Sequence, residues 1–156
     1  MYWLRIDNRL VHGQIIESWL PFTKPKMIVV ANDDLAGDSL RREIMGLAIP
    51  QDIQKAFLAV DAIKAFLMET FPPPEEPDAF ILFAGCGDAR RAHEKGLVFS
   101  RLNVGNLHYS SGKKQICAHV ALGKEDLACL GYFSSKGVKL DFRCVPNEPV
   151  QVDQVW

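Results

Sequence analysis

The sequence predicts an α/β fold in which helices cover both faces of a largely parallel β-sheet. Short apolar or β-branched runs alternate with segments of helical periodicity along the whole chain. Several of these runs are apolar at every position, as in Met27–Ala31 and Ala79–Ala84, which is typical of strands that are buried on both faces. Alternating strands and helices of this kind define the α/β class.

Seven segments carry the strand signal, in order along the chain. Each is a short run of apolar, aromatic or β-branched residues, too short for a typical helix. We expect strands at Tyr2–Ile6, Met27–Ala31, Lys55–Val60, Ala79–Ala84, Val98–Val104, Gln115–Leu122 and Lys139–Val145.

Helical spacing fills the intervals between these strands. The first predicted helix carries its apolar residues on one face and ends at Pro21. The next two begin at the N-cap residues Asp38 and Asp61, and a fourth begins at Asp88. The last predicted helix ends at Gly137.

The composition fits one globular domain that spans residues 1–156. Hydrophobic residues make up 48% and charged residues 24% of the chain, and the proline-rich stretch Phe71–Pro77 is interpreted as an exposed loop, not a domain boundary. The formal net charge of −1 provides no basic excess for nucleic acid. No apolar stretch has the length of a signal sequence or a membrane span, so we expect a cytoplasmic protein.

The four cysteines Cys86, Cys117, Cys129 and Cys144 lie far apart in the sequence and form no C-x-x-C pair. In a cytoplasmic protein this pattern favours reduced, mostly buried thiols. A zinc site built on Cys117 and His119 would lack the usual ligand spacing. We therefore expect neither a metal ion nor another cofactor.

The turn after the first predicted strand, Arg5–Gln14, is the segment richest in functional groups. Open α/β sheets bind ligands at the carboxyl ends of their strands, and this turn places His12 directly before a helix start. The helix terminus and Arg9 both favour an anion and a neutral imidazole, which is the nucleophilic form of the ring. A phosphoryl group on that ring would meet Arg9 and the amides around Gly13 and Gln14.

Two neighbours of His12 complete this candidate site. Gly13 allows the backbone to approach a phosphoryl group closely, and Asp7 is placed either to orient His12 or to pair with Arg5. The alternative is structural: Asp7 and Arg9 form a surface ion pair, and His12 is an incidental loop residue. The residues alone leave both interpretations open.

The run RIDNRLVHGQ closely resembles the phosphorylation-site loop of the IIB components of the mannose/fructose/sorbose-type sugar phosphotransferase system (PTS). The resemblance covers nearly the whole chain, and its further motifs occur in the same order. These are Val29–Asp33, Leu102–Gly105, Gly112-Lys113, Gly123–Asp126, Gly137-Val138 and Val145-Pro146.

This resemblance implies an open twisted sheet of about seven mostly parallel strands with helices on both faces. It also implies that His12 accepts a phosphoryl group from a histidine of a IIA partner and delivers it to a sugar at the membrane IIC/IID complex, with Arg9 steadying the group. The protein would then be a protein-Nπ-phosphohistidine–sugar phosphotransferase that meets the membrane only through partners. One departure is visible, because Gly105-Asn106-Leu107 stands where the family usually has Gly-Gly-Met.

Three further residues and two other functions complete the hypotheses. His108, after the fifth predicted strand, either positions the phosphoryl group or a partner, or is a solvated loop residue. Asn32 and Asp33 end the second strand and serve either as caps or as site residues. The alternative functions are a non-transporting regulatory module that signals through phosphorylated His12, and a flavodoxin-like domain that binds small anions.

Overall fold

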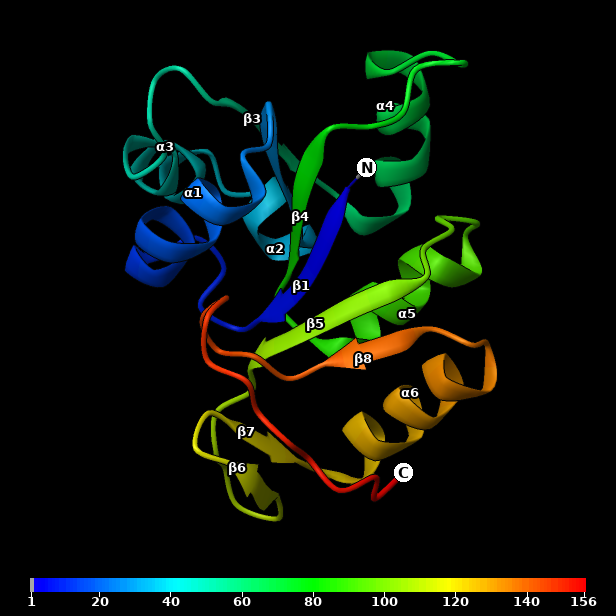
Figure 1. The fold of residues 1–156 in the computed structure, drawn as a ribbon. Helices are drawn as coiled ribbons and strands as arrows, with labels where there is room; N and C mark the ends of the chain where they lie inside the picture. The colour runs from blue at the N-terminus through cyan, green and yellow to red at the C-terminus, as the bar shows by residue number, and fades with distance from the viewer. Residues whose placement is uncertain (1) are drawn as a thin grey trace.

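The computed structural model describes residues 2–156, and its main layer is a six-stranded sheet (Figure 1). The strand order is β3-β2-β4-β1-β5-β8, and every neighbouring pair is parallel. The strands are β1 (Trp3–Asp7), β2 (Met27–Ala31), β3 (Gln54–Leu58), β4 (Ala79–Phe83), β5 (Arg101–Asn106) and β8 (Lys139–Asp141). The predicted class of a mostly parallel open sheet is confirmed.

The prediction that Gln115–Leu122 forms one strand of this sheet is wrong. It folds into an antiparallel hairpin of β6 (Lys114–Cys117) and β7 (Val120–Leu122) outside the main layer. The apolar run contains no glycine, proline or asparagine to mark the turn, so the sequence pattern reads as continuous. The backbone of Leu107 ties the hairpin to the end of β5, since its amide donates to His119 O at 3.0 Å and its carbonyl accepts from Ala121 N at 2.7 Å.

Helices cover the sheet on both sides, as predicted. Asn32 and Asp38 begin α2 and α3 by accepting hydrogen bonds from backbone amides three residues on, at 3.0 Å in both cases. No helix within residues 2–156 is long and apolar enough to cross a membrane. The helices are η1 (Ile15–Trp19, a π-helix), α1 (Leu20–Thr23), α2 (Asp33–Ala36), α3 (Ser39–Leu47), η2 (Val60–Ala62, a 3₁₀-helix), α4 (Ile63–Thr70), α5 (Cys86–Glu94) and α6 (Lys124–Ser135).

Both faces of the sheet bury apolar side chains, and one of them also buries a charged one. Figure 1 shows α4, α5 and α6 on one side, and α1 and α3 on the other. On β1, Leu4 and Ile6 belong to the apolar layer beneath α5 and α6. Arg5 points to the opposite layer, where its guanidinium lies 5.0 Å from the ring of Trp19, and it is fully buried together with Asp7. A charged pair is therefore enclosed at the carboxyl end of β1, a strand in the interior of the sheet.

The expectation that all cysteines are reduced is wrong for two of them. Cys86 and Cys129 form a disulfide between α5 and α6, whereas Cys117 and Cys144 are free and half-buried. The bonded cysteines are 43 residues apart, so no local motif connects them in the sequence. Packing of the two helices on the same face of the sheet brings them together.

Candidate functional site

The candidate site is the loop that leaves the carboxyl end of β1. A tight turn, in which the Leu10 amide donates to Asp7 O at 2.9 Å, holds Leu10 at a positive φ of 57° and buries its side chain. The carbonyl of His12 accepts from Ile15 N at 2.9 Å, so the histidine stands immediately before the first helical turn. From here the chain continues onto the face with η1, whereas the chain after β4 continues onto the face with α5. Neighbouring strands whose connections leave on opposite faces mark the usual ligand-binding edge of an α/β sheet.

Asp7 is the centre of this site and contacts three functional side chains. Its Oδ2 atom lies 2.9 Å from Nη2 of Arg5 and 2.9 Å from Nε2 of His12. Its Oδ1 atom accepts from Nε and from the backbone amide of Arg9, both at 3.1 Å. The Asp7 side chain is fully buried, whereas Arg9 is 40% and His12 is 17% exposed. The carboxylate thus holds one buried cation and two groups that reach the surface.

These contacts determine the protonation state of the carboxylate. Burial alone would raise the pKa of Asp7, but hydrogen bonds from His12 and Arg9 and the charge of Arg5 hold it well below its ordinary value. Burial also lowers the pKa of Arg5, and the Asp7 charge opposes that shift. Asp7 is therefore an ionised acceptor at neutral pH.

An ionised carboxylate can only accept hydrogen bonds, and this fixes the tautomer of His12. The ring nitrogen that faces Asp7 is Nε2, so Nε2 carries the proton. In the neutral ring, Nδ1 then keeps its lone pair, and it makes no hydrogen bond to any of the residues 2–156. Asp7 was expected either to orient His12 or to pair with Arg5, and in the structure it contacts both side chains.

The residues after His12 surround the exposed arginine. Gln14 Oε1 accepts from Arg9 Nη2 at 3.0 Å and from the Cys144 thiol at 3.4 Å. A Cβ atom added to Gly13 would meet no other atom within 4 Å. The space beside Gly13 is open, so folding does not require a glycine there, and its function in phosphoryl approach stays a prediction.

His108 joins the loop from the side of β5, through Asn8. The ring Nδ1 of His108 contacts the Asn8 amide, and Asn106 Nδ2 donates to Asn8 Oδ1 at 2.6 Å. No hydrogen bond connects His108 to His12 within the described part of the chain. Asn106, which departs from the family pattern, therefore braces the loop. Sequence reasoning assigned no contact to Asn8 or Asn106.

Asn32 and Asp33 are not part of the His12 cluster. Asn32 caps α2 and donates to Asp88 at 3.3 Å, and Asp33 accepts from Val60 N at 2.9 Å and from Arg91 at 2.5 Å. Within residues 2–156, none of their hydrogen bonds or ion pairs reaches the Arg5–Gln14 loop. The structure thus shows a capping function for Asn32 and a bracing contact for Asp33, and a function of either residue in the site stays a prediction.

Sequence reasoning also missed Asn103, which is 2% exposed on β5 and accepts from Arg5 Nη1 at 2.6 Å. The signal was present, because a polar residue inside the buried run Leu102–Val104 needs a polar partner.

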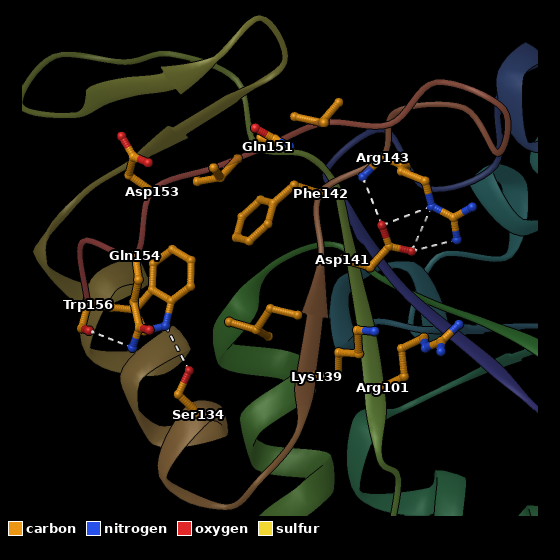
Figure 2. A pocket seen from close by; sticks show the side chains of 13 residues that line it. Arg101, Ser134, Lys139, Asp141, Phe142, Arg143, Gln151, Asp153, Gln154 and Trp156 are labelled. Atoms are coloured by element: carbon orange, nitrogen blue, oxygen red, sulfur yellow. Dashed lines mark hydrogen bonds and ion pairs between the residues drawn. The ribbon is translucent and has the colours of Figure 1, made fainter.

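A large hollow lies away from His12. It has a volume of about 710 Å³ and is formed by β8 and the C-terminal segment, with Asp141, Phe142, Arg143 and Trp156 among its lining residues (Figure 2). Its lining includes none of the side chains around Asp7. Within the described residues, no group of three or more His, Cys, Asp or Glu side chains could hold a metal ion.

The fold and the site define a class of α/β protein in which a buried carboxylate holds a histidine and an arginine at the carboxyl edge of a parallel sheet. The family model of the PTS system sorbose subfamily IIB component matches residues 1–154. The chain belongs to this family, and it is thus a transferase component of a sugar phosphotransferase system.

Individual relatives agree with this assignment. The sorbose-specific EIIB component of Klebsiella pneumoniae is 30% identical over 145 residues, which are 93% of this chain and 87% of that protein. The crystal structure of the N-acetylgalactosamine-specific IIB component 1 of Escherichia coli has a TM-score of 0.85 and 29% identity, and the match covers 99% of both chains. The mannose-specific EIIAB component of Escherichia coli (strain K12) is 28% identical, over 93% of this chain and 44% of that longer protein.

Proposed function

We propose that this protein accepts a phosphoryl group on Nδ1 of His12 from a phosphohistidine of a IIA protein and passes it to a sugar at a membrane IIC/IID complex. The observation that carries the proposal is the 2.9 Å contact between His12 Nε2 and Asp7, which leaves Nδ1 as the nucleophilic nitrogen. Nδ1 is the Nπ position, in agreement with a protein-Nπ-phosphohistidine–sugar phosphotransferase. The mannose-specific relative, named an EIIAB component, supports a IIA partner.

In the first step the Nδ1 lone pair of His12 attacks phosphorus, and the bond from phosphorus to the donor nitrogen breaks. The donor ring keeps that electron pair, and no proton has to leave His12 because the attacking nitrogen carries none. The phosphorylated ring holds a positive charge, which the ionised Asp7 carboxylate stabilises through the Nε2–H bond. In the second step a sugar hydroxyl attacks phosphorus, the electron pair returns to Nδ1, and the hydroxyl proton passes to water.

Arg9 supplies positive charge where the phosphoryl group passes. Its guanidinium is held between Asp7 and Gln14, and with 40% of the side chain exposed it can reach a group on the surface. Phosphoryl transfer depends mostly on positioning and charge stabilisation, so an arginine held in place in advance lowers the barrier without any metal ion. Gln14 accepts a hydrogen bond from the Arg9 guanidinium and so helps to fix its orientation.

Three further parts of the proposal concern the setting. The protein acts in the cytoplasm, meets the membrane only through IIC/IID, and binds no nucleic acid. The family membership and the sugar-specific names of the relatives support a function in sugar uptake. The relatives are named for different sugars, which agrees with substrate selection by the membrane partner.

The test is labelling by a phosphorylated IIA protein of the mannose type. One phosphoryl group should be incorporated, ³¹P NMR should place it on Nδ1, and His12→Ala should abolish it, whereas the matched variant His108→Ala should still be labelled. With membranes that contain IIC and IID, the label should move to sugar. Full labelling of His12→Ala would refute the proposal, and labelling without transfer to sugar would favour the regulatory alternative.

A further inference from the structure

A chain of buried polar groups runs from β5 to the reacting histidine. Asn103 Oδ1 accepts from Arg5 Nη1 at 2.6 Å, and Arg5 Nη2 donates to Asp7 Oδ2 at 2.9 Å. The same Oδ2 atom lies 2.9 Å from His12 Nε2. Of these four residues only His12 reaches the surface, since Arg5 and Asp7 are 0% and Asn103 is 2% exposed.

The position of Asn103 is itself fixed from the other side. Its Nδ2 atom donates to the carbonyls of Asp141 and Arg143, both at 3.0 Å, so the amide has one orientation that satisfies all three bonds. The reversed amide would direct N–H groups at the guanidinium. Figure 2 shows Asp141 and Arg143 at the end of β8, where they are joined by their own hydrogen bonds.

Arg5 has little freedom to choose another position. Its Nη2 and Nε atoms donate to Asp7, at 2.9 and 3.3 Å, and its Nη1 atom donates to Asn103 at 2.6 Å and more weakly to the Arg143 carbonyl at 3.3 Å. The Trp19 ring lies 5.0 Å from the central carbon of the guanidinium. A Cβ atom at Gly105 would lie under 3.0 Å from three guanidinium atoms, so the glycine makes the room that the group occupies. Asn103 is the neutral anchor in this arrangement, and Asp7 is the charged one.

We propose that Asn103 is a positioning residue for phosphoryl transfer, which acts through Arg5 on the Asp7 oxygen that orients His12. Without Asn103, Nη1 keeps only its longer hydrogen bond of 3.3 Å to the Arg143 carbonyl, and the guanidinium can rotate about its bonds to Asp7. The Oδ2 atom then no longer favours one geometry for the Nε2–H bond. The Nδ1–H tautomer, in which Nδ1 has no lone pair with which to attack phosphorus, gains population. The rate effect rests on the proposed function, whereas the tautomer effect belongs to the unmodified protein.

The test compares Asn103→Ala with Leu102→Ala in the full chain. Leu102 is buried on the same strand but belongs to the layer beneath α5 and α6, so its truncation lowers stability without touching Arg5. ¹⁵N NMR of the His12 ring, above its titration range, should show several-fold more Nδ1–H tautomer in Asn103→Ala and an unchanged ratio in Leu102→Ala. Single-turnover labelling by a phosphorylated IIA protein should slow about 10- to 100-fold in Asn103→Ala, the range typical of outer-shell partners.

A double-mutant cycle tests the route through Arg5. In an Arg5→Lys background, which lacks the Nη1 donor, Asn103→Ala should slow labelling by less than twofold further. Additive effects, or a folded Asn103→Ala protein with the wild-type tautomer ratio and rate, would overturn the inference. If Asn103→Ala does not fold, Asn103→Ser carries the same comparison with a smaller expected change. A wild-type protein that takes up no label would refute the proposed function. The tautomer ratio of His12 would still test whether Asn103 positions the ring.

Discussion

Gly105→Ala is the substitution that tests most directly how the buried guanidinium is held. The added methyl group would lie under 3.0 Å from Cζ, Nη1 and Nη2 of Arg5, closer than real Cβ contacts allow. Long side chains often absorb such a clash by moving their ends. Here the end is fully buried and bonded to Asp7 and Asn103, so the methyl group can enter only if at least one of these bonds breaks.

The cost follows from the type of contact that is lost. Overpacking a core typically costs 1–3 kcal/mol, and breaking a buried ion pair by removing one partner costs about 3–5 kcal/mol. The variant shifts the Arg5 cation without deleting it, so we expect a loss of about 3 kcal/mol in the free energy of unfolding. For a chain of this size, about 2–4 °C per kcal/mol corresponds to a drop of about 6–12 °C in Tm.

Urea unfolding monitored by tryptophan fluorescence would measure this loss, with the slope used to check two-state behaviour. Gly131→Ala is the matched control, because a Cβ atom in the middle of α6 would meet nothing within 4 Å. There the exchange should stabilise the protein by about 0.8 kcal/mol, the helix preference for alanine over glycine. A Gly105→Ala protein within about 0.5 kcal/mol of wild type would show that Arg5 is not constrained as we argue.

Three other outcomes are expected. Arg9→Ala should leave the fold intact and raise the transfer barrier by about 2–4 kcal/mol in single-turnover labelling, and near-wild-type rates would return Arg9 to a surface ion pair. The pKa of Asp7 is lowered in the folded protein, so its contribution to stability is complete above the unfolded-state pKa of about 4 and is lost as pH falls through the folded-state pKa. The free energy of unfolding should therefore fall on acidification, and Asp7→Asn should reduce this fall. Asn106→Gly, which restores the family's usual residue, should release Asn8 and increase hydrogen exchange in the Arg5–Gln14 loop, while labelling at Nδ1 of His12 persists. Unchanged exchange would show that Asn106 does not brace the loop.

The fold was predictable where each element carries its own signal. Fully apolar runs such as Met27–Ala31 identified strands of the sheet, because a parallel strand that is covered on both faces is mostly apolar. The hairpin β6-β7 was not predictable, because the turn between Cys117 and Val120 uses no turn-forming residue and is specified by contacts to Leu107. The disulfide had no local signal for the same reason, since packing of α5 against α6 determines it.

In the site, too, local features were predictable from the sequence and contacts between distant residues were not. The proximity of Asp7, Arg9 and His12 was predictable because all three lie in one short turn after a strand, where an α/β sheet usually binds its ligands. For Asn103, the need for a polar partner could be inferred from its place in a buried strand, but the partner itself could not, because Arg5 is 98 residues away in the sequence. Only the strand order, which places β5 beside β1, brings the two together.

The charges around Asp7 suit a group that must arrive and then leave. Two guanidinium groups and one carboxylate give the cluster one excess positive charge while His12 is neutral. In the proposed reaction a dianionic phosphoryl group joins a ring that becomes positive, so the modified histidine carries one net negative charge and the cluster becomes neutral. Buried ion pairs add little net stability, but they fix in advance the field that the phosphoryl group meets. A site with a larger positive excess would hold the phosphoryl group too tightly for a carrier, because binding energy spent on the intermediate slows its onward transfer.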